Sequence, residues 1–561
     1  MRKFKLIYEP NAFITTSSKN KFSRFNQILK LLKNSSQFII SEKKTGLFWI
    51  SHKNKGDWHK KDNLIPKYSN DKDPKISIIT KVKSIENHLG SIETSKRVEK
   101  KVPTNSAVRL FHVSNMIIKL LLGSAKETYS DYKQGNGFSV KGKILGNENI
   151  ETVNQTVKLL RGVALKFAQF INLNNIGIPI ELSNALNDAK KNAFAIPICQ
   201  VHKLMELEFG NGWKENIFAY FCENPFAAAS IGQVHHGILK DGQSVAVKIQ
   251  YPNIMKAILS DINLFQLINS YSRIFPKGLF INELMAELKK ELISECNYEN
   301  ELLFLKYYRE KIIPTMNVYD LKVNFYIPTV FNHLSTKKIL TTENMNSENT
   351  IEISSLFQDN IKSTFGLQNT MELRNSIAES LLYLTLHELF IFRTLQTDPN
   401  PANFLVDLKK NRIILLDFGA VRSYSEDFVD DYINMIRFAI SGSEPDIIKQ
   451  FIKMKFILGT ESEEFIKLHC NAIKMVSEVF KYSPSPFDFS KSEIVANISK
   501  IVPNILLKRE TPPLSDFYSL HRRIAGFFII CSRLGAAINS HKIFNQVLEK
   551  YNTRRVKSTP N

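Results

Sequence analysis

Cysteine is scarce in this chain of 561 residues, which has five cysteines and no two of them close enough to form a C-x-x-C pair. Proteins held together by disulfides and zinc sites built from paired cysteines both need closely spaced thiols. No cluster of Cys and His has the spacing of metal ligands either. The cysteine usage therefore excludes a disulfide scaffold and a structural zinc site, and it is typical of buried thiols in a reducing compartment.

Long apolar runs are also absent, because no stretch of 18 uninterrupted apolar residues occurs and no clear transmembrane helix is predicted. The nearest candidate is 107–122, in which Arg109, His112 and Lys119 interrupt an apolar sequence. Together with Asn115 they recur at every three or four residues, which predicts one polar stripe on a helix and suits an amphipathic helix at a membrane interface. A helix that packs on the protein's own core fits the same pattern. We therefore assign 106–149 to an amphipathic segment and leave open whether it contacts a membrane or the core.

Acidic residues are scarce near the N-terminus. The first 60 residues contain 13 Lys and Arg but only Glu9, Glu42 and Asp57 as acids, and the whole chain has a formal net charge of +21. This basic, hydroxyl-rich composition favours a mitochondrial presequence over a disordered basic tail, and no secretory signal is evident. The polar residues 61–105 are predicted to form a linker. The net charge indicates an anionic partner, namely anionic lipid, nucleotide or nucleic acid, or else a compositional bias towards Lys and Asn.

Apolar residues are abundant enough for a large core, since they make up 43% of the chain and 39 phenylalanines bring the aromatic content to 11%. Helical spacing predicts a helical extension over 150–225. The later patterns predict, in order, short strands over 226–251, a long charged helix over 282–308, an apolar helix over 373–396, a strand and loop over 412–420, and helices over 427–480 and 515–550. This order predicts a two-lobed, protein-kinase-like α+β fold. Its N-lobe would be 226–345, and its C-lobe with helical C-terminal additions would be 346–550.

A lysine at the end of a predicted strand marks a candidate phosphate contact. Lys248 closes the sequence Val-Ala-Val-Lys, and in kinases such a lysine reaches the ATP phosphates and pairs with a helix glutamate. The octad 227–234 fits the frame of a G-x-G-x-x-G-x-V phosphate loop, although alanines replace two glycines. Alanine makes the loop stiffer than glycine would, so the sequence predicts an ATP loop with altered phosphate handling rather than the N-terminus of a small-residue helix. The loop residues assigned to the nucleotide are Ala227, Ala228, Ala229 and Ser230.

Two further motifs complete the kinase order. Asp398 and Asn403 have the D-x4-N spacing of a kinase catalytic loop, in which the Asp orients a nucleophile or water and the Asn binds magnesium. Asp417 begins a D-F-G sequence 14 residues after Asn403, and this Asp would join magnesium to phosphate. The His-Arg that usually precedes the catalytic Asp is replaced by Gln396 and Thr397. A lone D-F-G is common by chance, but these motifs in kinase order are a specific signal for an ATP site.

The A-P-E sequence that follows the D-F-G of protein kinases is absent here. Residues 420–431 lead directly into a predicted helix, so the long activation segment that docks peptide substrates is missing. The sequence therefore favours ATP hydrolysis over protein phosphorylation.

From about residue 105 to 550 the chain resembles the UbiB family of atypical kinases, in particular its mitochondrial coenzyme Q branch. The resemblance is carried by PFAAASIGQVH (225–235), VAVKIQYP (245–252), ELISECNYENE (291–301), QTDPN (396–400), LLDFGA (415–420), MKFILG (454–459) and YSLHRRIAGFFIICSRLGA (518–536). The alanine-rich loop is the hallmark of that family. The resemblance implies a kinase-like fold, magnesium-dependent ATPase activity with ATP or ADP and Mg²⁺ as cofactors, and association with the matrix side of the mitochondrial inner membrane. The partners it implies are coenzyme Q biosynthesis proteins, lipid quinone intermediates and a cardiolipin-like anionic membrane surface, with a homodimer as a further candidate.

The family also carries a K-x-G-Q segment in a helical extension that covers the active site. The matching sequence here is Lys166-Phe167-Ala168-Gln169, in which Ala168 replaces the family glycine. Lys166 and Gln169 are three residues apart and would share one face of a helix. The resemblance thus implies a regulatory role for both side chains.

The E-x-D motif that accompanies this segment reads Glu295-Cys296-Asn297 here. An amide therefore replaces a carboxylate, which removes one negative charge beside the lysine of the extension. The resemblance implies regulatory roles for Glu295, Asn297 and Glu301. Either Glu295 or Glu301 would pair with Lys248, and the sequence alone does not choose between them.

The function predicted from the sequence is a MgATP-binding ATPase of the atypical kinase class that supports coenzyme Q biosynthesis. We also assign Glu343, Asn344 and Met345, at the end of the N-lobe, to nucleotide binding. The alternatives are a noncatalytic nucleotide-binding scaffold of the same pathway and a small-molecule kinase. The charge alone would allow a nucleic-acid protein, but no recognition motif appears and no nucleic-acid partner is predicted.

Overall fold

The computed structural model describes most of the chain from residue 194 onwards and short parts before it. The described residues are 100, 103, 108–112, 114–116, 147–160, 162, 166, 194–272, 278, 280–316, 321–347, 349–358 and 370–558. The predicted presequence, most of the linker, and Gln169 lie outside them. The chain divides into two units, 1–71 with 267–274 and 72–266 with 275–561. Of the first unit only the end of one helix is described, and the fold below is that of the second unit.

A five-stranded antiparallel sheet forms the predicted N-lobe. Its strands are β1 (Phe218–Phe221), β2 (Ala227–Ala228), β3 (Gly232–Leu239), β4 (Ser244–Gln250) and β6 (Ile339–Glu343). They follow the order β1-β3-β4-β6, and β2 pairs with β3 beside this path. Gly242, at a φ of +83°, closes the β3–β4 hairpin as the Asp-Gly sequence predicts. Strand β1 corrects the prediction of helix up to residue 221.

Strand β4 shows why the sequence folds this way. Its β-branched residues Val245, Val247 and Ile249 are fully buried, whereas Ala246 and Lys248 between them are only partly buried. Since successive side chains of a strand point to opposite faces, the apolar set packs into the core. The same alternation turns Lys248 to the other face of the sheet.

The charged segment predicted as one helix over 282–308 is in fact two helices, α10 (Ile281–Glu295) and α11 (Tyr298–Tyr307). The break falls at Cys296 and Asn297, and the Asn297 side chain caps α11 by accepting a hydrogen bond from the backbone N–H of Glu299 at 3.1 Å. An Asn in extended conformation before a helix is a strong N-cap. The break places Glu295 on α10 and Glu301 on α11, whereas a continuous helix would have carried both.

The C-lobe contains one four-stranded sheet and two two-stranded sheets. One sheet has the order β5-β10-β9-β7, built from β5 (Asn324–Tyr326), β7 (Thr350–Glu352), β9 (Phe404–Asp407) and β10 (Arg412–Leu415). The others pair β8 (Thr394–Gln396) with β11 (Val421–Ser423), and β12 (Phe487–Asp488) with β13 (Ala537–Ile538). The apolar helix predicted over 373–396 is α14 (Thr370–Phe390), which is buried on all sides from Ser380 to Phe390, and its predicted last residues form β8 instead.

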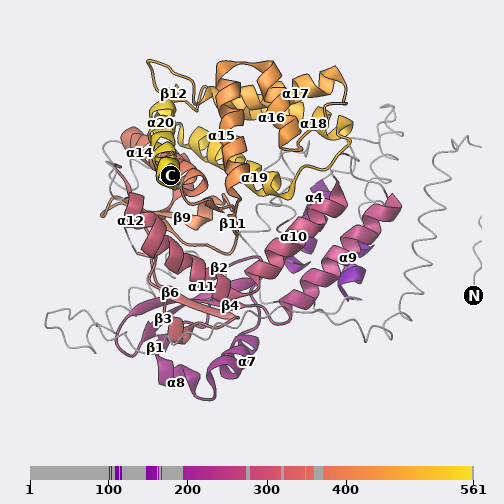
Figure 1. The fold of residues 1–561 in the computed structure, drawn as a ribbon. Coiled ribbons are helices and arrows are strands. Elements are labelled where there is room, and N and C mark those ends of the chain that lie inside the picture. The colour runs from indigo at the N-terminus through magenta and orange to yellow at the C-terminus, as the bar shows by residue number, and fades with distance from the viewer. Residues whose placement is uncertain are drawn as a thin grey trace, which may run out of the picture. The chain divides into compact units, whose positions relative to one another are not determined.

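The other helices of the described chain complete the fold. They are α4 (Asn147–Leu160), α7 (Ile198–Phe209), α8 (Trp213–Ile217), α9 (Ile254–Ser272), α12 (Ile313–Met316), α15 (Glu426–Ser441), α16 (Glu444–Lys453), α17 (Glu463–Glu478), α18 (Ile494–Lys508), α19 (Ser515–Leu534) and α20 (Ser540–Ser558). A π-helical turn spans Tyr308–Ile312, and 3-10 turns span Asn332–Leu334, Ile353–Phe357 and Pro401–Asn403. In Figure 1, α15 to α20 gather at the end opposite the sheet of β1, β3, β4 and β6. The expected two-lobed α+β architecture is confirmed.

The described part of the amphipathic segment turns its arginine inward. Arg109 is fully buried and forms an ion pair with Asp261 of α9, and it also donates a hydrogen bond to the carbonyl of Leu160 at 2.8 Å. Phe111 beside it is 65% exposed. Arg109 therefore belongs to a packed interface and contributes no charge to a surface stripe. Among the helices that the structure describes, none is both long and apolar enough to cross a membrane.

Candidate active site

The pairing of β8 with β11 brings the two acidic motifs together. β8 leads into the D-x4-N loop and β11 follows the D-F-G, and Val421 of β11 lies opposite Gln396 of β8. The Gln396 side chain donates to the carbonyl oxygens of Asp398, at 2.9 Å, and of Asp417, at 3.3 Å. Gln396, which stands where kinases usually have His, therefore links the backbones of both motifs to the β8–β11 pair.

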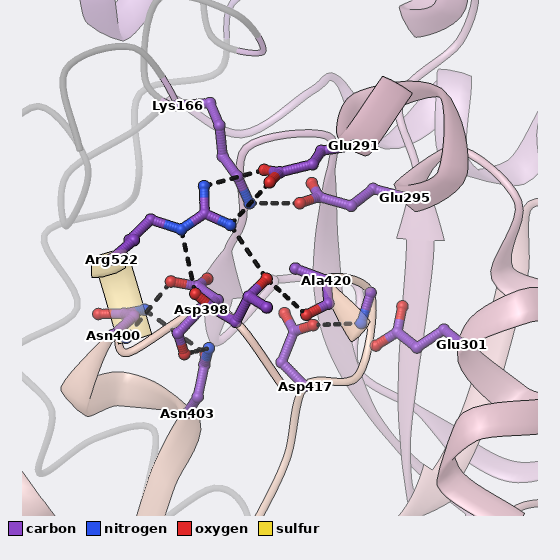
Figure 2. A network of polar contacts seen from close by, with 12 residues as sticks. Lys166, Glu291, Glu295, Glu301, Asp398, Asn400, Asn403, Asp417, Ala420 and Arg522 are labelled. Carbon is purple, nitrogen blue, oxygen red and sulfur yellow. Dashed lines mark hydrogen bonds and ion pairs between the residues drawn. The ribbon is translucent and has the colours of Figure 1, made fainter. Parts of the chain in front are cut away.

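Asn403 lies next to Asp398, the predicted catalytic aspartate. Its amide donates to the Asp398 carbonyl at 3.5 Å, and its Oδ1 accepts from Asn400 at 3.5 Å. Asn400 in turn caps the 3-10 turn that carries Asn403, and its backbone N–H donates to the Asp398 carboxylate at 3.3 Å. The structure therefore brings together the predicted catalytic and metal-binding side chains of this loop (Figure 2).

Lys248 faces the D-F-G motif and pairs with Glu301. Its Nζ lies 2.8 and 2.9 Å from the two carboxylate oxygens of Glu301 on α11, and 3.7 Å from Asp417. Burial alone would lower the pKa of Lys248, but the carboxylates of Asp417 and Glu301 outweigh it and hold that pKa well above its ordinary value. The lysine is therefore a fixed positive charge, and of the two candidate glutamates the structure selects Glu301.

Glu295 pairs instead with the lysine of the N-terminal extension. Lys166 and Glu295 are both buried and form an ion pair, and Figure 2 shows the Lys166 side chain pointing into the site beside Arg522. Burial would lower the pKa of Lys166, but Glu295, Asp398 and Glu291 together raise it. The extension thus places a permanent cation among the acidic groups of the candidate active site.

The extension also touches the alanine-rich loop. The backbone N–H of Gly162 donates to the carbonyl of Ser230 at 3.0 Å. Within the loop, the N–H of Ala229 donates to the carbonyl of Gly232 at 2.7 Å, while Ala227 and Ala228 pair with β3 as a short strand. The predicted phosphate loop is therefore a tight turn held from outside by the extension.

Close packing requires a glycine at position 232, the one glycine position of the phosphate-loop frame that this loop retains. A Cβ at this position would lie 2.6 Å from the carbonyl oxygen of Ile249 and 2.6 Å from the hydroxyl of Tyr298. Real Cβ atoms do not approach so closely, so any larger residue would push the loop away from β4. Gly419 of the D-F-G is similarly confined, since its Cβ would contact both Asp417 and Glu295.

Sequence reasoning did not single out Arg522 and Arg523 of α19 as site residues. Arg522 forms a bidentate ion pair with Glu291, with both distances at 2.9 Å, and donates to the carbonyl and hydroxyl oxygens of Thr397, both at 3.0 Å. Arg523 donates to the side-chain carbonyl of Gln396 at 3.1 Å. The signal available was the His-Arg-Arg of the C-terminal motif. Arg522 contacts Thr397, which is 125 residues away along the chain, so the sequence gives no local sign that it supports the D-x4-N loop.

The predicted nucleotide residues at the end of β6 lie beside β4. The Glu343 carboxylate accepts hydrogen bonds from the Tyr326 hydroxyl, at 2.6 Å, and from the backbone N–H and side-chain hydroxyl of Thr329. The N–H of Asn344 donates to the carbonyl of Ser244 at 3.0 Å. Among the described residues, the backbone N–H of Met345 has no hydrogen-bond partner. At this position the backbone rather than the Glu343 side chain is available to a ligand.

The residues present fit a magnesium ion. Asp417 is partly exposed, and one of its oxygens accepts from the N–H of Gly419 at 2.8 Å while the other faces Lys248. Magnesium takes oxygen ligands and is commonly held by one or two carboxylates together with substrate phosphates. Asp417 and the Oδ1 of Asn403 supply such oxygens. No group of three or more His, Cys, Asp or Glu able to hold a metal alone occurs within the described ranges.

A strand lysine paired with a helix glutamate, a D-x4-N loop and a D-F-G, all at the junction of two lobes, define a protein-kinase-like nucleotide-binding protein. The chain belongs to the family of ABC1 atypical kinases, because residues 188–451 match the ABC1 atypical kinase-like domain and relatives of that class align over most of its length. The expected membership of an atypical kinase family is thereby confirmed.

Three relatives show how far the similarity extends. The chain is 35% identical over 458 residues to the atypical kinase COQ8B, mitochondrial, of Danio rerio, which covers 81% of this chain and 70% of the relative. It is 34% identical to the COQ8B of Rattus norvegicus, over 81% and 82% of the two chains. It is 32% identical to the atypical kinase COQ8, mitochondrial, of Saccharomyces cerevisiae, over 80% and 85%.

Proposed function

We propose that this protein is a mitochondrial MgATP-dependent ATPase of the atypical kinase class that supports coenzyme Q biosynthesis. The observation that supports the proposal is the convergence of Lys248, Asp398, Asn403 and Asp417. Lys248 lies 3.7 Å from Asp417, Asn403 donates to the Asp398 carbonyl, and Gln396 bonds the backbone of both aspartates. The names of the COQ8 relatives supply the compartment and the pathway.

Each side chain has a defined task in this proposal. Lys248, held in place by Glu301, contacts the phosphates, and Asp398 orients the attacking water. Asp417 and Asn403 hold the magnesium ion, whose charge offsets that of the phosphates when it is bound. Backbone groups at Asn344 and Met345 are proposed to meet the base, and residues 227–230 the phosphates.

The same contacts argue against a peptide substrate. A protein kinase leaves the space in front of its catalytic Asp open to the peptide, whereas here Lys166 occupies the acidic surroundings of Asp398 and pairs with Glu295. We infer that the extension restricts access to water and small molecules. Association with the matrix face of the inner membrane through the basic surface remains part of the proposal.

Expression in Saccharomyces cerevisiae mitochondria that lack the COQ8 protein tests this function. The intact chain is expected to restore coenzyme Q content, and Lys248→Met, which removes the phosphate contact, is expected to abolish the rescue at equal protein level. Full rescue by Lys248→Met would point instead to the noncatalytic scaffold. No rescue by the intact, imported chain would contradict the assignment to this pathway.

A further inference from the structure

A cavity separate from the candidate active site lies among the C-lobe helices, and none of the predicted nucleotide-site residues lines it. Its volume is about 290 Å³ and its wall is formed chiefly by α17, α18 and α19. A dry engineered cavity of about 150 Å³ takes up benzene. The cavity of this protein is therefore large enough for a ligand bigger than a single ring.

Helix α18 explains why the cavity is apolar. Its sequence IVANISKIVPNILLK is rich in Ile, Val and Leu, yet only Ile494 of this helix is buried. Ile498, Val502 and Leu506 face the cavity and stay partly exposed. Apolar surface of this kind is unfavourable in water and marks a binding site when it is contiguous and concave.

One end of the cavity carries a positive charge, Arg509, that forms no direct ion pair, although Glu461 acts on it from a greater distance and raises its pKa. The guanidinium of Arg509 stacks on the ring of Phe456 at 4.6 Å and donates to the carbonyls of Thr511 and Phe456 at 2.8 and 3.1 Å. In the part of the chain that the structure describes, no carboxylate forms an ion pair with Arg509. Burial lowers the pKa of Arg509 to about 10, so the side chain stays protonated at neutral pH.

Two histidines beside Arg509 add neutral hydrogen-bonding groups. Burial lowers the pKa of His469 and of His521 to about 4. His469 is 97% buried and its Nδ1 lies 3.0 Å from the carbonyl of Phe465, while its Nε2 has no partner among the described residues. The apolar cavity therefore ends at a guanidinium that has no carboxylate in direct contact and at the Nε2 of His469, which has no hydrogen-bond partner among the described residues.

We propose that this cavity binds a single-chain amphiphile with an anionic headgroup. The chain packs against the exposed apolar face of α18, and a carboxylate or phosphate oxygen pairs with Arg509, since a guanidinium binds both groups through charge-assisted hydrogen bonds. Inorganic phosphate alone would leave the apolar wall uncovered, and an uncharged chain would leave Arg509 unpaired.

Helix α19 connects this cavity to the catalytic loop. His521, Ala525 and Phe528 lie at helical spacing on the face that lines the cavity. Arg522 and Gly526 lie on the other face, where Arg522 bonds Thr397 and Gly526 packs against Pro399. A ligand in the cavity therefore contacts the helix that positions Asp398. Binding itself stands apart from ATP hydrolysis, and only this coupling rests on the proposed function.

Calorimetry on the full chain tests the binding with four probes below their micelle concentrations, namely decanoate, decyl phosphate, 1-decanol and inorganic phosphate. Decanoate and decyl phosphate are expected to bind at one site, 1-decanol at least tenfold more weakly, and inorganic phosphate without measurable heat. Ala472→Phe fills the cavity and should weaken both anionic amphiphiles at least tenfold. Ala496→Phe makes the same change on the side of α18 that faces solvent and does not line the cavity, so it should leave both affinities unchanged.

Variants of Arg509 test the site independently, in case Ala472→Phe fails to fold. Arg509→Gln should bind decanoate and 1-decanol with equal affinity, whereas Arg509→Lys should keep part of the preference for the anion. Equal decanoate binding by the intact protein, Ala472→Phe and Arg509→Gln overturns the site. Absence of binding by the intact, folded protein overturns it as well.

The coupling is read from MgATP affinity with and without decanoate. A change of threefold or more in the intact protein, absent in Ala472→Phe, is expected. Decanoate binding at this cavity without any change in MgATP affinity refutes the coupling through α19. A protein that binds decanoate but no MgATP contradicts the proposed function and leaves the amphiphile site standing.

Discussion

At the scale of single residues, the site is built from buried charges that are paired across helices. Lys166 with Glu295 and Arg522 with Glu291 are two such pairs, each joining segments more than 100 residues apart. Removing one partner of a buried pair leaves an uncompensated charge and costs about 3–5 kcal/mol. These pairs therefore fix the geometry of the site more than they add to its stability.

Glu388 gives the protein a pH-dependent stability. It is fully buried 3.8 Å from Arg523, and burial raises its pKa to about 7. Below about pH 4.5 the carboxyl is neutral in both the folded and the unfolded chain, whereas above about pH 7 the folded chain must bury the anion. The intact protein should therefore lose about 3 kcal/mol of unfolding free energy relative to Glu388→Gln as the pH rises through this window.

Denaturant titrations of the two proteins at pH 4.5, 6 and 7.5 measure this difference directly. The comparison cancels the buried histidines, which titrate in both proteins. A difference that does not change with pH would show that Glu388 keeps an ordinary pKa in the folded chain.

The sequence predicted those site residues that belong to local motifs. Lys248, Asp398, Asn403 and Asp417 stand at fixed spacings that their chemistry requires, so their positions follow from the chain itself. The choice between Glu295 and Glu301 did not, because it depends on the break at Asn297. Asn297 reads in the sequence as a lost carboxylate, but in the structure it caps α11 and so orients Glu301.

At the scale of elements, α19 acts as the brace of the catalytic loop. Gly526 lets this helix approach so closely that an added Cβ would lie 2.0 Å from the Cβ of Pro399. Gly526→Ala should therefore displace the loop that carries Asp398 and Asn403, and lower MgATP hydrolysis at least tenfold. Steady-state hydrolysis at matched folded fractions measures the effect.

Gly442→Ala serves as the control, because a Cβ there would meet no atom within 4 Å although its φ of +82° adds backbone strain. This control should lose stability and keep its hydrolysis per folded molecule. Equal hydrolysis by Gly526→Ala and the intact protein would show that α19 does not hold the loop.

Element types were easier to predict than their ends. Alternating β-branched residues at 245–249 predict β4 because the strand is half buried, and the apolar run of α14 predicts a buried helix. The segment 282–308 has helical periodicity throughout, so an N-cap inside it competes with a pattern that spans both helices. Strand β1 is four residues long and gains its structure from pairing with β3, which no local signal reveals.

At the scale of the whole molecule, we propose that the part of the extension that carries Lys166 controls access to the site. Lys166→Ala leaves Glu295 without its partner and removes the cation from the surroundings of Asp398. We expect phosphorylation of a generic basic peptide to be undetectable with the intact protein and to become measurable with Lys166→Ala. Lys203→Ala on the exposed face of α7 makes the same change elsewhere and should have no effect. Robust peptide phosphorylation by the intact protein would contradict a covering extension.

The central claim is that this site binds and hydrolyses MgATP through Asp417. Calorimetry with MgATP, followed by phosphate release from the same samples, compares the intact chain with Asp417→Asn and with Asp427→Asn, an exposed aspartate of α15. We expect the intact chain and Asp427→Asn to bind and hydrolyse alike. Asp417→Asn should lose at least tenfold in magnesium-dependent affinity and nearly all hydrolysis, because the ion then lacks its protein carboxylate. Unchanged binding and hydrolysis in Asp417→Asn would contradict the account.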